Sequence, residues 1–228
     1  FAEQTAVAIE DYVYDDVNDY WNYLHHFLDY PDFSVFTGVI PEESLFEYGL
    51  GLWPRFVVEY LDDDWSFLVK LIETYFDEPV PDLWDAYEAY DNVLREEYDT
   101  TVSEMYIDFA LTNYLRGYEE GENYPDVFIH ATHAADAYPV VAAEVAADQV
   151  PALFGTNYLQ FEVDSLSWNR DFELTVEKPV GVEFWVGLLM ENATNNAEEW
   201  ELAYQLIPAD YSGGVTTTKL SSGTDRVT

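Results

Sequence analysis

The hydrophobic pattern of the chain changes its period near residue 158, and this change constrains the fold more than any other feature. Over positions 45–60 apolar residues recur every three or four positions, which predicts a helix with one buried face. From 172 to 176 apolar and polar residues alternate, which predicts a strand with one solvent-facing side. We therefore expect an α+β fold, with an N-terminal α-helical domain over 1–157 and a small antiparallel β-sandwich-like module over 158–228.

Local signals set the bounds of the expected elements. Thr101 and Glu104 form a capping-box pattern at the start of one helix, and Gly117 is placed to end it. The other helices are expected at about 41–60, 65–76 and 82–98. The last residues, 225–228, resemble the beginning of a strand, so we expect the β module to be truncated at its C-terminal end.

The charge of the chain restricts its partners. There are 46 Asp and Glu residues against 8 Lys and Arg, which gives a formal net charge of -38. A field of this sign repels phosphate backbones and anionic headgroups, and no apolar stretch is long enough to span a bilayer. We expect no nucleic-acid partner and no membrane insertion. With 49% apolar and 18% aromatic residues, the chain has enough side-chain area for a core, so disorder is not expected.

The same composition bears on location. Only three lysines occur, and such an acidic surface is typical of proteins that work in salt or divalent cations outside the cytoplasm, where screening shortens the reach of self-repulsion. We therefore expect a secreted or extracellular protein. A salt-adapted cytosolic protein is the alternative. The absence of cysteine excludes disulfides and cysteine-ligated zinc.

Two groups of residues could hold a metal ion. His130 and His133 would lie one helical turn apart and could form a metal-binding pair; a surface histidine pair is the alternative. A second group packs oxygen ligands into a short run and could hold a hard cation such as calcium. This run consists of Asp15, Asp16, Asn18 and Asp19. A solvated helix face is the alternative for it.

The N-terminal segment carries the most specific pattern. Glu3 is followed by Ala6 and then by the acidic run that ends at Asp19. The segment resembles the stretch downstream of the HExxH helix in gluzincin-type zinc metallopeptidases, particularly a group of secreted bacterial proteins. Further matches are Tyr48-Gly49, the run 113–117 and the trailing β module. The resemblance implies that Glu3 is the third zinc ligand and that the substrate is a peptide or protein. A glutamate that is favoured at a helix start by the helix dipole is the alternative for Glu3.

The chain departs from that family in one respect. No HExxH sequence occurs in it, so two imidazole ligands and the general base are missing. Phe1 is not an initiator Met, and we expect these residues upstream in a longer chain. Our first hypothesis is therefore a part of an exported zinc-metallopeptidase-like protein that is not active alone.

A second hypothesis belongs to another class. The chain could be a non-catalytic extracellular structural or assembly protein that reuses the same scaffold. Divalent cations would then bridge acidic faces in a homo-oligomer or filament, and an incomplete terminal strand would suit strand donation between neighbours. A weaker third hypothesis is a carbohydrate-binding or carbohydrate-cleaving module, because exposed aromatic rings beside acids can stack on sugars.

Overall fold

The computed structural model divides into two compact units, Phe1–Phe161 and Glu162–Thr228; the sequence predicted a boundary between 157 and 158. Each unit is described by itself. The described residues are 1–14, 16–36, 45–77, 83–125, 128–129, 132–135, 151–161, 172–176, 184–191, 200–207 and 216–220.

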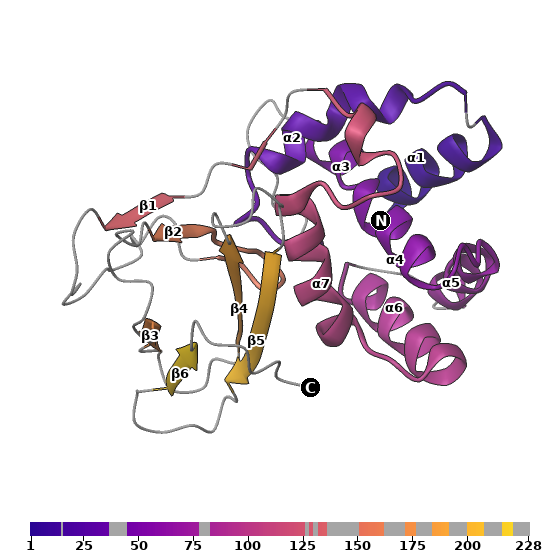
Figure 1. Ribbon diagram of the computed structural model, residues 1–228. Helices are drawn as coiled ribbons and strands as arrows, with labels where there is room; N and C mark the ends of the chain where they lie inside the picture. The colour runs from indigo at the N-terminus through magenta and orange to yellow at the C-terminus, as the bar shows by residue number, and fades with distance from the viewer. Residues whose placement is uncertain are drawn as a thin grey trace. The chain divides into compact units, whose positions relative to one another are not determined.

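The first unit consists mainly of helices (Figure 1). In chain order these are α1 (Ala2–Val13), the 3-10 helix η1 (Asp19–Tyr23), α2 (Leu24–Leu28), α3 (Phe46–Gly49), α4 (Leu52–Tyr60), α5 (Ser66–Phe76), α6 (Leu83–Tyr98), α7 (Val102–Leu115) and the 3-10 helix η2 (Gly121–Asn123). Two short strands, β1 (Thr132–Ala135) and β2 (Leu159–Phe161), pair in parallel.

Helix α7 shows how local sequence sets a boundary. Thr101 has an extended backbone, and its side-chain oxygen accepts a hydrogen bond from the backbone N–H of Glu104 at 3.1 Å. The Thr101 hydroxyl also donates to the Glu104 carboxylate at 3.0 Å. The predicted N-cap at Thr101 is confirmed, with the difference that Glu104 returns its bond to the Thr101 hydroxyl and not to the backbone N–H of a full capping box. At the other end the left-handed residue is Arg116, one position before the glycine that we expected to end the helix.

The helix expected over 41–60 is not continuous in the structure. Residues 41–44 lie outside the described part, and the remainder forms two helices, α3 and α4, separated by Leu50 and Gly51. Other segments approach this junction closely. A Cβ atom built on Gly49 would lie 2.6 Å from the carbonyl oxygen of Tyr23, and one on Gly51 would lie 2.5 Å from Val7 Cγ1. Tertiary contacts therefore override the helical period here.

This close approach gives a first prediction. We expect Gly49→Ala to lower the free energy of unfolding by about 1–3 kcal/mol, because the added methyl group overlaps backbone and core atoms. Gly117→Ala is the matched control: its Cβ would meet nothing closer than Thr112 Cγ2 at 3.7 Å. Urea unfolding followed by circular dichroism measures both variants. Equal stabilities of the two variants would contradict the close packing at Gly49.

Aromatic rings form the centre of the helical core. Trp53 is fully buried, and its ring centroid lies 5.1 Å from that of Phe109 and 5.7 Å from that of Tyr90. Phe36 meets the Trp53 ring edge to face at 5.9 Å. Such offset and perpendicular arrangements are the favoured geometries of aromatic pairs. The high aromatic content of the sequence is thus used to fill the interior of this unit.

The second unit overturns the expected fold class. Its described strands are β3 (Phe172–Val176), β4 (Phe184–Glu191), β5 (Trp200–Ile207) and β6 (Thr216–Leu220). They form two separate antiparallel pairs, β3 with β6 and β4 with β5. The described residues are mostly helical, and their strands form no sheet of more than two strands and no sandwich. The predicted α+β fold with an antiparallel β-sandwich-like module is therefore wrong.

The physical reason is that alternation predicts a strand but not its neighbours. Strands lie within the alternating stretches at 159–161, 172–176 and 184–191. Which strand pairs with which depends on contacts between residues far apart in sequence, and a sandwich needs two larger sheets that face each other. The pattern in the sequence carries neither piece of information.

Candidate functional site

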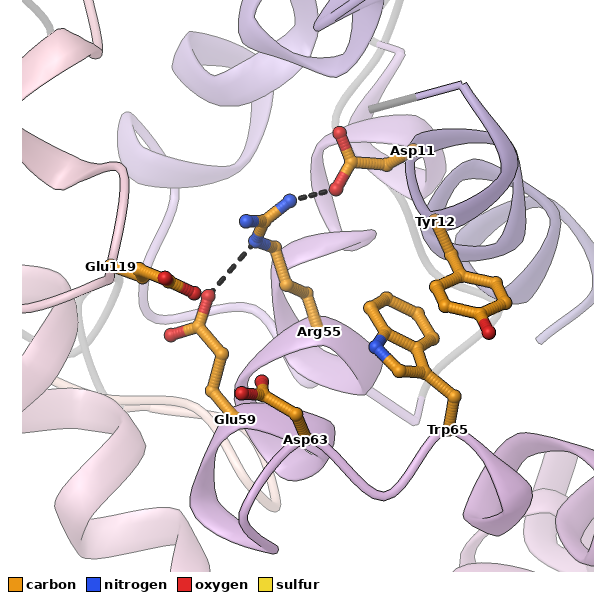
Figure 2. Close-up of a pocket in the computed structure, with 7 residues that line it drawn as sticks. All are labelled: Asp11, Tyr12, Arg55, Glu59, Asp63, Trp65 and Glu119. Atoms are coloured by element: carbon orange, nitrogen blue, oxygen red, sulfur yellow. Dashed lines mark hydrogen bonds and ion pairs between the residues drawn. The ribbon is translucent and has the colours of Figure 1, made fainter. Parts of the chain in front are cut away.

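A pocket of about 330 Å³ in the first unit is the strongest candidate site (Figure 2). We call it the Arg55 pocket. Helix α1, helix α4, the turn after α4 and the segment after α7 contribute its walls. The lining residues are Asp11, Tyr12, Arg55, Glu59, Asp63, Trp65 and Glu119.

Arg55 is the central residue of this pocket. Its side chain is only 8% exposed and forms an ion pair with Asp11. It also contacts Glu59 at 3.0 Å, one helical turn along α4, and Glu120 at 3.2 Å. The guanidinium carbon lies 5.1 Å from the centroid of the Tyr20 ring. One buried cation thus serves three carboxylates and an aromatic face, which fixes its position.

The carboxylates around Arg55 are incompletely neutralised. Burial raises the pKa of Glu59, while Arg55 and the backbone N–H of Glu119 act in the opposite direction. The side chain of Asp11 is 6% exposed, and its Oδ1 atom has no hydrogen-bond partner among the described residues. A buried acceptor in this state costs free energy unless a donor reaches it. The Nη1 atom of Arg55, which faces Asp11, is likewise without a hydrogen-bond partner among the described residues, so this ion pair leaves one donor and one acceptor unmatched.

Two aromatic residues flank the opening. The Tyr12 and Trp65 rings stack with centroids 4.3 Å apart and an interplanar angle of 24°, and Figure 2 shows them side by side below Asp11. Trp65 is brought there by a tight turn in which Asp62 and Asp63 both adopt left-handed backbone angles, φ 56° and 60°. Aspartate tolerates this conformation better than most residues. The turn places the Asp63 carboxylate and the Trp65 ring on one wall.

Glu3, the predicted zinc ligand, lies outside the Arg55 pocket. It is in the first turn of α1 and is exposed to solvent. Its carboxylate accepts a hydrogen bond from the Tyr48 hydroxyl, and this bond is the main reason why the pKa of Tyr48 is raised. In the described part of the chain it forms no ion pair with a lysine, arginine or histidine.

The Glu3–Tyr48 contact gives a second prediction. We expect Glu3→Ala to lower the pKa of Tyr48 towards its ordinary value, because both the hydrogen bond and the nearby negative charge are lost. With Glu3 present, Tyr48 stays protonated to higher pH. Titration by NMR of ¹³Cζ-labelled tyrosine, assigned with Tyr48→Phe, measures the change. Glu10→Ala on the same helix is the control and should leave Tyr48 unaltered; equal shifts would argue against the contact.

The side chains of the predicted hard-cation run do not form a common site in the described part of the chain. Asp15 lies outside the described residues, and Asp16 is exposed. Asn18 adopts a left-handed backbone at φ 47°. Asp19 already accepts hydrogen bonds from the side chains of Asn22 at 3.0 Å and Tyr23 at 3.3 Å, so both of its oxygens are engaged by side chains of η1.

Only one residue of the predicted histidine pair lies in the described part of the chain. His130 lies outside the described residues, and His133 is in strand β1 opposite Gln160, not in a helix. Across the described ranges no group of three or more His, Asp or Glu side chains is arranged to hold a metal ion. The calcium and zinc predictions therefore stay predictions.

The sequence analysis missed the residues of the Arg55 pocket. The available signal was Arg55 itself, one of only 8 basic residues, placed between apolar residues of an amphipathic helix with Glu59 four positions later. A charged side chain on the buried face of a helix requires a partner of opposite charge that is also buried. The partners Asp11 and Glu120 are distant in sequence, so no local pattern identifies them.

Comparisons with known proteins identified no relative of this chain. No family model, curated protein or solved structure matches the chain. None of the described helices combines the length and the apolar character needed to cross a membrane.

Proposed function

We propose that this chain is part of a zinc metallopeptidase in which Glu3 supplies a carboxylate ligand and histidines outside these 228 residues supply the others. The observation that carries the proposal is that the Glu3 carboxylate is both accessible and oriented. Its carboxylate is exposed on α1 and accepts a hydrogen bond from Tyr48. A hydrogen bond of this kind orients a carboxylate ligand and is typical of the outer shell of metal sites.

The exposed face of α1 supports the same proposal. Ala6 and Glu10 are exposed on this helix together with Glu3, at the spacing that places side chains on one face. A small residue beside the ligand leaves room for another helix to approach closely. We infer that the segment carrying the imidazole ligands packs against this face.

The described residues do not fit a complete zinc site by themselves. Zinc takes about four ligands at roughly 2 Å, whereas Glu3 is a single carboxylate and no group of three metal-binding side chains is present in the described ranges. We therefore derive no catalytic step from this chain. Its part in the proposed enzyme is to supply and orient one ligand.

The test is the zinc affinity of the natural full-length protein. We expect Glu3→Gln to weaken zinc binding by at least about 100-fold and to abolish peptide hydrolysis, and Tyr48→Phe to weaken zinc binding about 10- to 100-fold. Glu73→Gln, which changes an exposed glutamate on α5, is the matched control and should retain both properties. Equal zinc affinity of the Glu3→Gln and Glu73→Gln proteins would overturn the proposal, as would a full-length protein that binds no zinc.

The assembly hypothesis predicts a different result. If divalent cations bridge acidic faces, particle size in light scattering should fall when a chelator is added, and Glu3→Gln should have no special effect. A monomer of unchanged size in both conditions counts against that hypothesis.

A further inference from the structure

We propose that the C-terminal end of α1 docks a segment of another protein that combines apolar side chains with lysine or arginine, as a basic amphipathic helix does. The docking surface consists of Tyr12, Val13, Tyr14 and Val17, and we call it the α1-end patch. The inference does not rest on the proposed zinc ligand, because Val13 follows Glu3 by ten positions, about 15 Å along the helix.

The α1-end patch gathers large exposed apolar side chains in one place. The exposed fractions are 55% for Tyr12, 57% for Val13, 61% for Tyr14 and 58% for Val17. Among the described residues 13 large apolar side chains are exposed, and these four lie within six consecutive positions. A single exposed apolar residue is ordinary, whereas a contiguous group of them indicates an interaction surface.

Backbone hydrogen bonds hold the patch together. The Tyr14 N–H donates to the Glu10 carbonyl at 2.9 Å, where the helix ends, and the Val17 N–H donates to the Tyr14 carbonyl at 2.7 Å. This turn keeps Val17 beside the last turn of α1. The Tyr12 ring is fixed in addition by its stack on Trp65. The surface is therefore preorganised, which lowers the entropic cost of binding a partner.

The charge around the patch determines what can cover it. Asp16 and Asp19 are exposed on one side, and Asp19 lines a narrow crevice together with Val17. Asp62 and Asp63 are exposed in the turn before α5. In the described part of the chain none of these four acids forms an ion pair, and positions 1–54 contain no lysine or arginine. Basic residues of a partner would meet carboxylates without a counter-charge at the edge of an apolar surface.

The same charge argues against a second copy of this chain as the occupant. A two-fold interface would place the patch against the identical patch, and so the acids of one copy against the acids of the other. With a net charge of -38 on each copy, the two would repel each other. An anionic membrane surface is repelled for the same reason. A basic amphipathic segment complements both the apolar side chains and the acids, as in other helix-binding proteins.

Fluorescence anisotropy with a labelled model peptide tests the proposal on the natural full-length protein. The probe is a short peptide of leucine and lysine with the leucines on one helical face. A control peptide of equal charge has serine in place of leucine. We expect the probe to bind at least about tenfold more tightly than the control, with an affinity that falls as salt is added. Absence of probe binding at high micromolar concentration and low salt, or equal binding of both peptides, would overturn the proposal.

Two double variants with matched changes locate the binding surface. Tyr14→Ser with Val17→Ser removes an aromatic residue and a valine from the patch. Phe76→Ser with Val69→Ser removes the same kinds of side chain from α5, where they are also exposed. Neither pair changes the net charge, and circular dichroism verifies that both proteins fold. We expect the patch variant to bind the probe at least about tenfold more weakly and the α5 variant to bind normally. Equal affinities of the two variants would contradict a site at the end of α1.

A second pair of variants tests the part played by the acids. Asp16→Asn with Asp19→Asn removes two charges beside the patch, and Glu73→Gln with Glu96→Gln removes two exposed charges elsewhere. At low salt we expect the first protein to bind the probe about three- to tenfold more weakly than the second. Equal affinities would contradict the charge complementarity. A dimer in light scattering that the Tyr14→Ser, Val17→Ser protein no longer forms would show that a second copy occupies the patch, and would overturn the proposal.

Discussion

Replacing Arg55 by Met should lower the free energy of unfolding by about 3–5 kcal/mol, because removing one partner leaves buried carboxylates without a counter-charge. The side chain of Arg55 is 8% exposed, and Asp11, Glu59 and Glu120 all contact it. Urea unfolding near neutral pH measures the loss. The loss should shrink as the pH is lowered into the range where carboxyl groups take up protons, because a neutral carboxyl needs no cation.

Arg95→Met is the matched control for this variant. Arg95 also pairs with an acid four residues away in a helix, Asp91 at 2.6 Å, but its side chain is 58% exposed. Exposed pairs of this kind contribute little to stability. If Arg55→Met were no more destabilising than Arg95→Met, the three ion pairs of Arg55 would not be important for the fold.

Trp53→Ala should have a similarly large effect, about 3–5 kcal/mol, because a fully buried aromatic side chain is lost and the cavity closes only partly. Trp53 is 0% exposed, and rings from other segments of the unit surround it, including Phe36 and Phe109. Differential scanning calorimetry and urea unfolding measure the loss. Loss of the stacking geometry adds to the loss of buried area.

Phe76→Ala provides the comparison for the core variant. Phe76 ends α5 and is 65% exposed, so its removal should change the free energy of unfolding by no more than about 0.5 kcal/mol. A destabilisation of Trp53→Ala as small as that of Phe76→Ala would show that the aromatic cluster is not the core of this unit.

Elements whose signals are local could be predicted from the sequence. Thr101 and Glu104 cap α7 as their spacing indicates, and α5 and α6 begin and end close to the predicted positions. Each depends on residues within one helical turn of each other. The break between α3 and α4, at Leu50 and Gly51, could not be predicted, because the residues that approach this junction closely, Tyr23 and Val7, come from other helices.

Elements that depend on distant residues could not be predicted. Strand β3 pairs with β6 and not with the next strand along the chain, so alternation alone gave the wrong fold class. The Arg55 pocket joins Asp11, Glu59 and Glu119 from three segments, and a sequence with 46 acidic residues does not indicate which of them meet. The predicted ligand Glu3 depends on a resemblance, and its role is open to the zinc experiment.

The stack of Tyr12 on Trp65 has a spectroscopic consequence. It holds two chromophores face to face, one at the end of α1 and one at the start of α5, and such a pair gives a coupled band in near-ultraviolet circular dichroism. Fraying of α1 would separate the rings and remove this band while most of the helical far-ultraviolet signal persists. Comparison with a Tyr12→Leu protein would isolate the band and distinguish opening of one helix end from global denaturation.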